Sequence, residues 1–218
     1  MARLLASVRT RTITTIAELR KSLTDTRSIA VTGMLLAVML LITFMPFLNF
    51  QIGPLRVTLL HIPVLIGVIA EGLPVGLILG GAFGIISLLR AFSTPSATSF
   101  VLQNPIIAIL PRLLIPVVAY LVTRSVRAAT KRSLIAETAG AFCGAATNTV
   151  LVLSLIALLY GERYGLAMQG LGRLDALHVI LFSTALTNGL PEAVVAAIMV
   201  PAVIGALRRA RLTPKDVA

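Results

Sequence analysis

Charged residues are scarce in this chain, and their scarcity decides the solvent in which it folds. Only 12% of the 218 residues are charged and 57% are hydrophobic, and the mean hydropathy is +0.98. A soluble domain carries about 25% charged residues, so this composition excludes an ordinary soluble protein. The apolar runs are continuous, whereas strands of a membrane barrel alternate in hydropathy. The sequence therefore predicts an all-α, polytopic membrane bundle without a separate soluble domain.

Cysteine, tryptophan and the common catalytic motifs are rare or missing. Cys143 is the single cysteine and Trp is absent, which excludes an intrachain disulfide and a cysteine metal cluster. No GxxxxGK[ST], GxSxG or HExxH motif occurs, and His61 and His178 lie in different apolar segments. We therefore expect no metal or cofactor in this chain and no ATP hydrolysis by it. The two halves also show no obvious repeat, which weakens the case for a self-sufficient secondary transporter.

Six apolar segments account for most of the chain. The second and third are short enough to be a re-entrant hairpin, and only the sequence EGLP separates them. We expect six transmembrane helices in all. The segments are residues 29–48, 57–70, 74–89, 100–123, 134–160 and 177–207.

The basic residues predict the topology. Six lie before residue 29, four between residues 124 and 132, and four after residue 207. Basic residues collect on the cytoplasmic side of a membrane, so both termini and the 124–132 loop should face the cytoplasm. An even number of crossings must then precede residue 124, which two short spans or a re-entrant hairpin satisfy and one long helix over 57–89 does not. The loops at 46–56, 90–99 and 161–176 should lie outside, and the net charge of +11 indicates topology rather than binding to nucleic acid.

Three regions follow from this pattern: a tail over 1–28, a transmembrane substrate-binding domain over 29–207 and a C-terminal cytoplasmic tail over 208–218. The first region has no apolar run of the kind that a signal peptide requires. Its Ile16, Leu19 and Leu23 recur at helical spacing among basic residues. We expect a basic amphipathic helix on the inner membrane surface; a polar tail without regular structure is the alternative.

Two ionisable residues fall deep inside the apolar segments, where a charge is costly unless it is paired or hydrated. Arg112 lies some dozen residues into the fourth segment from the outside, roughly 18 Å down at 1.5 Å per residue. Glu192 lies about fifteen residues into the sixth segment, roughly 22 Å down. These depths predict that the two side chains meet near the floor of a common cavity. The alternative is a buried ion pair that only sets helix register.

Further polar residues point to a binding pocket in the outer half or the middle of the bilayer. Each could instead make a hydrogen bond between helices. Pro105, Pro111, Pro116 and Pro191 free backbone carbonyls, as in helices that line a cavity. The candidate pocket residues besides Arg112 and Glu192 are His61, Arg90, Gln103, Asn104, Asn148 and Asn188.

Small residues recur four apart on several segments, as at close helix contacts. Gly76, Gly80 and Gly84 form one such stripe, and Gly140 and Gly144 form another. The first segment carries a shorter version at Gly33 and Ala37.

The blocks HIPVLIG, NPIIAILPR and NGLPEA, in this order, resemble the substrate-binding S components of energy-coupling factor (ECF) vitamin transporters, and among them the pantothenate branch. The resemblance covers about 29–207. It implies six helices, a substrate site on the outer side, and a complex with a transmembrane coupling subunit and two cytoplasmic ATPase subunits that hydrolyse ATP. It also implies that Gly33 and Ala37, at the position of the family's small-xxx-small motif, contact the coupling subunit.

Pantothenate is the substrate that this resemblance favours, and its carboxylate, hydroxyls and amide suit a cation surrounded by amide side chains. Another small vitamin or precursor, such as hydroxymethylpyrimidine or pyridoxine, is the first alternative. An intramembrane enzyme that uses Glu192 as its acid or base is the second.

Overall fold

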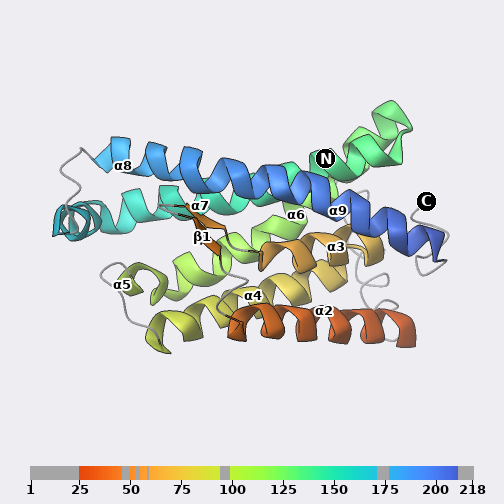
Figure 1. Ribbon diagram of the computed structural model, residues 1–218, viewed down its shortest axis with the longest axis horizontal. Helices are drawn as coiled ribbons and strands as arrows, with labels where there is room; N and C mark the ends of the chain where they lie inside the picture. The colour runs from red at the N-terminus through yellow and green to blue at the C-terminus, as the bar shows by residue number, and fades with distance from the viewer. Residues whose placement is uncertain are drawn as a thin grey trace, which may run out of the picture.

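A computed structural model of the chain describes residues 25–45, 50–52, 55–57, 59–93, 99–170 and 177–210. Within these ranges it is an elongated bundle of helices with one small β-hairpin (Figure 1). The predicted amphipathic helix before residue 25 and the tail after residue 210 lie outside the described residues. The elements in chain order are α2 (Thr26–Phe44), β1 (Phe50–Ile52), β2 (Leu55–Val57), α3 (His61–Glu71), α4 (Leu73–Ser93), α5 (Ser99–Leu102), α6 (Pro105–Thr130), α7 (Ser133–Gly170), α8 (Leu177–Thr184), the π-helix η2 (Ala185–Gly189) and α9 (Leu190–Arg209).

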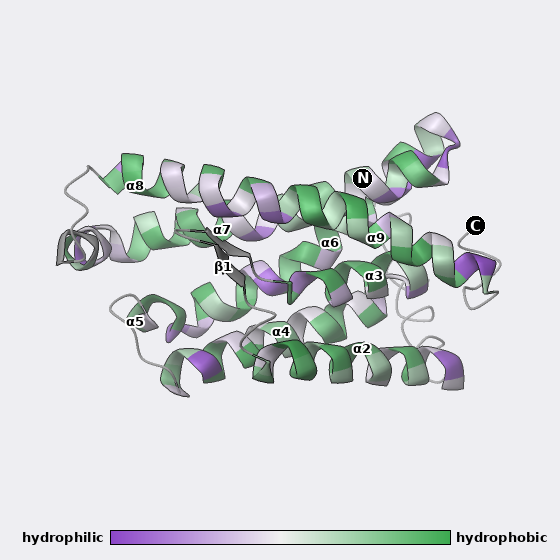
Figure 2. Cartoon of the chain, viewed as in Figure 1, coloured by the Kyte–Doolittle hydropathy of each residue, from purple (hydrophilic) through white to green (hydrophobic). Residues whose placement is uncertain are grey.

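The predicted membrane segments are confirmed as helices, with corrected bounds. Five helical stretches are long and apolar enough to cross a membrane, and α8, η2 and α9 together form the last of them. The most hydrophilic positions lie mainly at helix ends (Figure 2). The third segment was expected to be short, but α4 has 21 residues. The helix of the fifth segment continues ten residues past Tyr160, into the predicted outer loop, after a kink at that residue.

The second segment is the shorter one, because α3 has only 11 residues. At 1.5 Å per residue it is about 16 Å long, roughly half the hydrocarbon thickness of a bilayer. It turns directly into α4 at Gly72, whose φ of 96° suits a residue without a side chain. The predicted break between the second and third segments is therefore confirmed.

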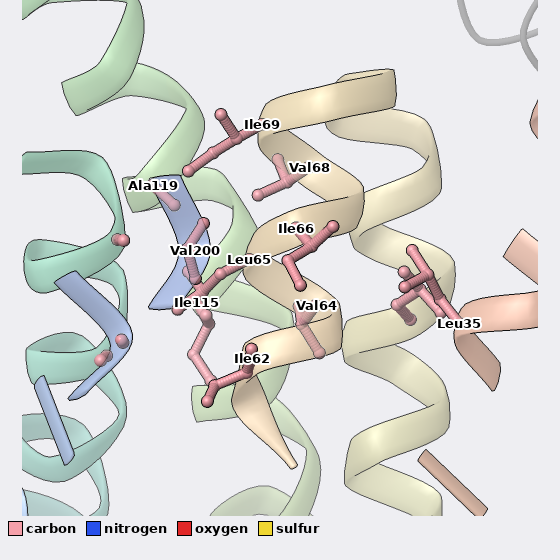
Figure 3. Packing of buried hydrophobic residues seen from close by; sticks show 14 of the residues in the cluster. Leu35, Ile62, Val64, Leu65, Ile66, Val68, Ile69, Ile115, Ala119 and Val200 are labelled. Carbon is pink, nitrogen blue, oxygen red and sulfur yellow. The ribbon is translucent and has the colours of Figure 1, made fainter. Parts of the chain in front are cut away.

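Helix α3 lies at the centre of the bundle. Its residues from His61 to Ala70 are all buried, and it contacts α2, α4, α6, α7 and α9. Figure 3 shows its side chains spreading in several directions, toward Leu35 of α2, Ile115 of α6 and Val200 of α9. A helix that is apolar on all sides is stable only when it is surrounded, and α3 accordingly forms the middle of the main core.

A β-hairpin precedes α3, where the sequence predicted only a loop over 46–56 and a helix from residue 57. Strands β1 and β2 pair antiparallel, with Gln51 opposite Arg56 and Phe50 opposite Val57. The second strand lies against η2. This pairing provides hydrogen-bond partners for non-helical backbone, which is the requirement for any such segment within a membrane protein.

The glycine stripes on α4 and α7 are confirmed as packing surfaces, and both face α6. A Cβ added at Gly80 would lie 2.5 Å from the carbonyl oxygen of Arg112, and one added at Gly84 would lie 2.9 Å from the Cα of Ile109. A Cβ added at Gly144 would lie 2.9 Å from Ala119. Side chains at these positions would push the helices apart, so the glycines set the close approach of α4 and α7 to α6.

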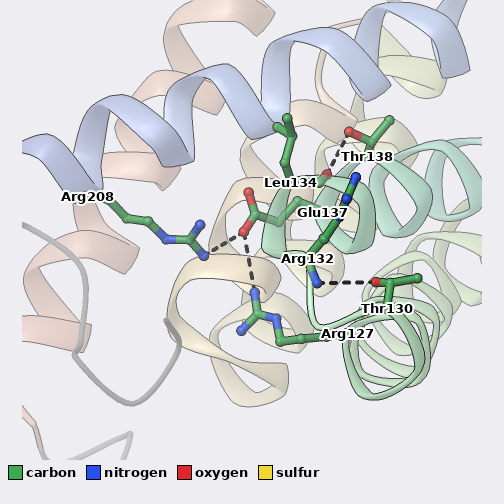
Figure 4. A network of polar contacts seen from close by, with 7 residues as sticks. All are labelled: Arg127, Thr130, Arg132, Leu134, Glu137, Thr138 and Arg208. Atoms are coloured by element: carbon green, nitrogen blue, oxygen red, sulfur yellow. Dashed lines mark hydrogen bonds and ion pairs between the residues drawn. The ribbon is translucent and has the colours of Figure 1, made fainter.

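Ion pairs join the helices at one end of the bundle, which we call the basic end. The buried carboxylate of Glu137 on α7 lies 3.4 Å from Arg127 of α6 and 2.5 Å from Arg208 of α9. Figure 4 shows the two arginines reaching Glu137 from different helices. At the same end Glu71 pairs with Arg27 at 3.5 Å and accepts a hydrogen bond from Ser28. The ion pairs of Glu137 hold α6, α7 and α9 together, and the contacts of Glu71 hold α2 to α3.

Candidate functional site

Arg112 is buried inside α6, with 6% of its surface exposed. Its Nη1 donates a hydrogen bond of 2.8 Å to the carbonyl of Ile107. Its guanidinium carbon lies 5.3 Å from the centre of the Phe83 ring on α4. Glu192 on α9 attracts its charge, so the structure brings together the two ionisable residues whose depths were matched in the sequence.

One donor of this guanidinium remains unused. The Nε atom of Arg112 is buried and has no hydrogen-bond acceptor among the described residues. A buried donor without an acceptor costs roughly 1–3 kcal/mol, so an acceptor from a ligand or a water molecule would stabilise it.

Asn148 on α7 shows the complementary feature. Its Oδ1 atom is buried and receives no hydrogen bond from the residues that the structure describes. One turn closer to the basic end, a Cβ added at Gly144 would lie 3.4 Å from the carbonyl of Ile115. Arg112 precedes Ile115 by one turn on the antiparallel α6, so the unused donor and the unused acceptor lie at the same level of the bundle.

The level of the bundle that contains Arg112 and Asn148, which we call the polar level, separates two hydrophobic clusters. The larger cluster, toward the basic end, includes Ile115 of α6, Ala145 of α7 and Ala193 of α9. The smaller cluster, toward the opposite end, includes Ile107 of α6, Ile156 of α7 and Ile180 of α8. On each of these three chain segments a polar residue lies between the two clusters. The first two segments contribute Arg112 and Asn148. The third contributes Asn188 and Glu192, and Glu192 directly precedes Ala193.

The third segment also changes its backbone geometry at this level. η2 is a π-helix, a form that is rare and frequent at functional sites. It contains Asn188, which is half-buried and donates to the hydroxyl of Thr187 at 3.4 Å. Gly189 ends it, and a Cβ there would strike Thr149, next to Asn148. Sequence reasoning identified Asn188 but not the π-helix, for which the NGLP sequence was the available signal.

His61 is the first residue of α3 and is 2% exposed. The sequence placed it one turn inside a helix; the structure corrects this, because the preceding residues form the hairpin. Gly67 of α3 packs against Leu79 of α4. Continuing along both helices away from the basic end brings His61 close to the level of Phe83, at the edge of the polar level.

Three predicted residues lie elsewhere, at the end of the bundle opposite the basic end. Arg90 is exposed in the last turn of α4. Gln103 donates to the carbonyl of Ala91 at 3.1 Å. Asn104 caps α6 through a bond of 3.0 Å from the amide of Ile106 and donates to the hydroxyl of Tyr160, at the kink of α7, at 3.2 Å. Both amides thus hold helix ends, about 12 Å along α6 from Arg112.

The first helix carries the remaining predicted residues, Gly33 and Ala37, on an exposed face. A Cβ added at Gly33 meets no atom within 4 Å, unlike the glycines of α4 and α7 named above. Gly33 lines an apolar groove of about 280 Å³ between α2 and α4, whose walls include Ser28, Leu36, Val75 and Ile78. Ala37 is one turn further along the same helix.

Fold and site together define a multi-pass, all-α membrane protein with a polar level enclosed between two apolar clusters. The chain matches the family described as the substrate-specific component of the ECF transporter over residues 27–204. It therefore belongs to this family, and the resemblance seen in the sequence is confirmed. The family is one of transport proteins.

Two relatives carry substrate names. The chain is 32% identical over 201 residues to the pantothenic acid transporter PanT of Lactococcus lactis subsp. cremoris, an alignment that covers 84% of this chain and 94% of the relative. It is 33% identical over 96 residues to the pantothenate transporter PanT of Leuconostoc mesenteroides subsp. mesenteroides, which covers 41% of this chain and 47% of that relative.

Proposed function

We propose that this chain is the substrate-binding subunit of an ECF importer for pantothenate, and that pantothenate binds at the polar level between the two hydrophobic clusters. The observation that carries the proposal is the pair of buried, unused groups: the Nε donor of Arg112 and the Oδ1 acceptor of Asn148. Pantothenate has a carboxylate to accept from the arginine, and hydroxyl and amide hydrogens to donate to the asparagine. The substrate names of the two relatives agree with this choice.

The carboxylate contact is the strongest single interaction in this proposal. A hydrogen bond to a charged group contributes about 1.5–3 kcal/mol, and burial of Arg112 keeps water from competing. Glu192 balances the guanidinium charge while the site is empty. His61 and Asn188, at the same level, supply further contacts to the hydroxyls and the amide.

The remaining predicted residues have a more distant role in this proposal. Gln103 and Asn104 border the approach from the outer side, and Arg90 attracts the anion there. Arg90 is also the second choice for the carboxylate partner, because it is a further arginine on that half of the bundle.

The partners follow from the family and from α2. We propose that a helix of the transmembrane coupling subunit lies along the face that contains Gly33 and Ala37. The open space at Gly33 and the groove beside it support this assignment. ATP is hydrolysed by two cytoplasmic ATPase subunits, this chain holds no cofactor, and both termini and the basic end face the cytoplasm.

Calorimetric titration of the purified chain tests the site. Arg112→Ala should weaken binding of pantothenate at least tenfold, which corresponds to about 1.4 kcal/mol, and should weaken binding of the neutral analogue pantothenol much less. Arg90→Ala tests the second candidate, the exposed arginine in the last turn of α4. Equal losses of the two ligands in Arg112→Ala would reject its carboxylate role, and a selective loss in Arg90→Ala would transfer that role to Arg90.

A further inference from the structure

We infer that Phe83 and Pro111 are positioning residues, which hold the guanidinium of Arg112 so that its Nε edge faces the substrate carboxylate. This inference rests on the proposed function, because it concerns how the carboxylate partner is oriented. Neither residue need touch the substrate. A long arginine side chain has many rotamers, so a site that depends on one donor edge needs contacts that select one of them.

Pro111 creates the first of these contacts. In a regular helix the amide of residue 111 would donate to the carbonyl of Ile107, but proline has no N–H. Ile107 is fully buried, so its carbonyl needs another donor. The Nη1 atom of Arg112 supplies it at 2.8 Å. The proline therefore leaves an acceptor that fixes one corner of the guanidinium, which explains why the arginine directly follows it.

Phe83 supplies the second contact. Its ring is 3% exposed and lies 5.3 Å from the guanidinium carbon, within the range of an attractive cation–π contact. Gly80 and Gly84 allow α4 to approach α6 at the carbonyl of Arg112 and at the Cα of Ile109. The ring is thereby brought against the arginine from the neighbouring helix.

Together the two contacts leave the Nε edge for a ligand. A guanidinium presents five N–H donors in one rigid plane. The Phe83 ring attracts the guanidinium charge through its face. The carbonyl of Ile107 accepts the hydrogen bond from Nη1. Nε is the donor that stays buried without an acceptor among the described residues. Carboxylates pair well with such an edge because the geometry of both groups is planar.

The test is the ratio of the pantothenol Kd to the pantothenate Kd, which measures carboxylate recognition and cancels losses common to both ligands. Phe83→Leu should reduce this ratio about tenfold, as expected when a desolvated cation–π contact is lost. Phe83→Tyr, which keeps the aromatic ring, should leave the ratio near the wild-type value. Pro111→Ala returns an N–H to Ile107, releases Nη1 and should reduce the ratio several-fold. Phe100→Leu is the matched control, because Arg163 lies 5.4 Å from the Phe100 ring but outside the polar level; its ratio should not change.

The outcomes separate this inference from the proposed function. If Arg112→Ala lowers the ratio while Phe83→Leu and Pro111→Ala leave it unchanged, the positioning roles are wrong and the carboxylate role of Arg112 stands. If Arg112→Ala itself leaves the ratio unchanged, both the inference and the proposed carboxylate partner are overturned. Should Phe83→Leu fail to fold, Pro111→Ala and Phe83→Met decide the matter by the same ratio.

Discussion

Glu137 is the residue whose neutralisation should most destabilise the basic end of the bundle. It is 1% exposed, and its carboxylate is the common partner of Arg127 and Arg208. Glu137→Gln keeps the size of the side chain and an acceptor oxygen but removes the charge. Three helices then lose the contact that joins them, and two arginines lose their counter-charge.

The expected magnitude follows from the exposure of the two arginines. Breaking a buried ion pair by removing one partner costs about 3–5 kcal/mol when the remaining charge stays buried. The side chains of Arg127 and Arg208 are 27% and 24% exposed, so water can partly solvate them after the change. We therefore expect a loss of about 2 kcal/mol, which for a chain of this size corresponds to a fall in Tm of about 4–8 °C.

Thermal unfolding of the detergent-solubilised protein, followed by circular dichroism, measures this change. Glu162→Gln on the same helix is the matched control, because Glu162 is exposed, and its Tm should hardly change. Arg208→Ala should cost less than Glu137→Gln, since Arg127 still pairs with the carboxylate. If Glu137→Gln and Glu162→Gln unfolded at the same Tm, the ion pairs of Glu137 would contribute no net stability, contrary to the expected loss.

Two further predictions concern topology and assembly. A cysteine at Ser93 should react with an impermeant reagent in intact cells and one at Thr130 should not, because the basic residues predict that the α6–α7 turn faces the cytoplasm; the reverse labelling would invert the predicted topology. Replacing Gly33 and Ala37 together with Leu should abolish copurification with the ATPase subunits and leave pantothenate affinity intact, because the added side chains lie on the exposed face of α2, where Gly33 lines the groove, and not at the polar level. Joint loss of affinity and copurification would instead mean that these residues pack within this chain.

Much of the helical architecture could be predicted, because a bilayer leaves the backbone few alternatives. Counting residues from the ends of the segments also matched the depths of Arg112 and Glu192, since the rise of a helix is constant. The direction of each helix face could not be predicted in the same way. Lipid and the protein core select equally apolar side chains, so hydropathy does not tell a buried face from an exposed one. On the same helix, for example, Leu35 is buried and Leu40 is exposed.

The hairpin and the π-helix could not be predicted from the sequence for a related reason. Residues 50–57 are mostly apolar and adjoin a buried helix, so hydropathy could not distinguish two short strands from a loop and the start of a span. The π-helix depends on one extra residue before Pro191, which no periodicity in an apolar segment reveals. Asn104 is different: an asparagine directly before a proline is a common start of a helix, and this signal could have identified its capping bond beforehand.

Binding of pantothenate at the polar level around Arg112 and Asn148 can be tested on the ligand that the chain carries out of the cell. The most direct measurement is to purify the chain from cells grown with isotope-labelled pantothenate and to identify, by mass spectrometry, the small molecule released on unfolding. We expect stoichiometric labelled pantothenate from the wild-type chain and little or none from a folded Arg112→Ala variant. Release of a pyrimidine or a pyridoxine-like molecule instead, or equal amounts of pantothenate from both proteins, would contradict it.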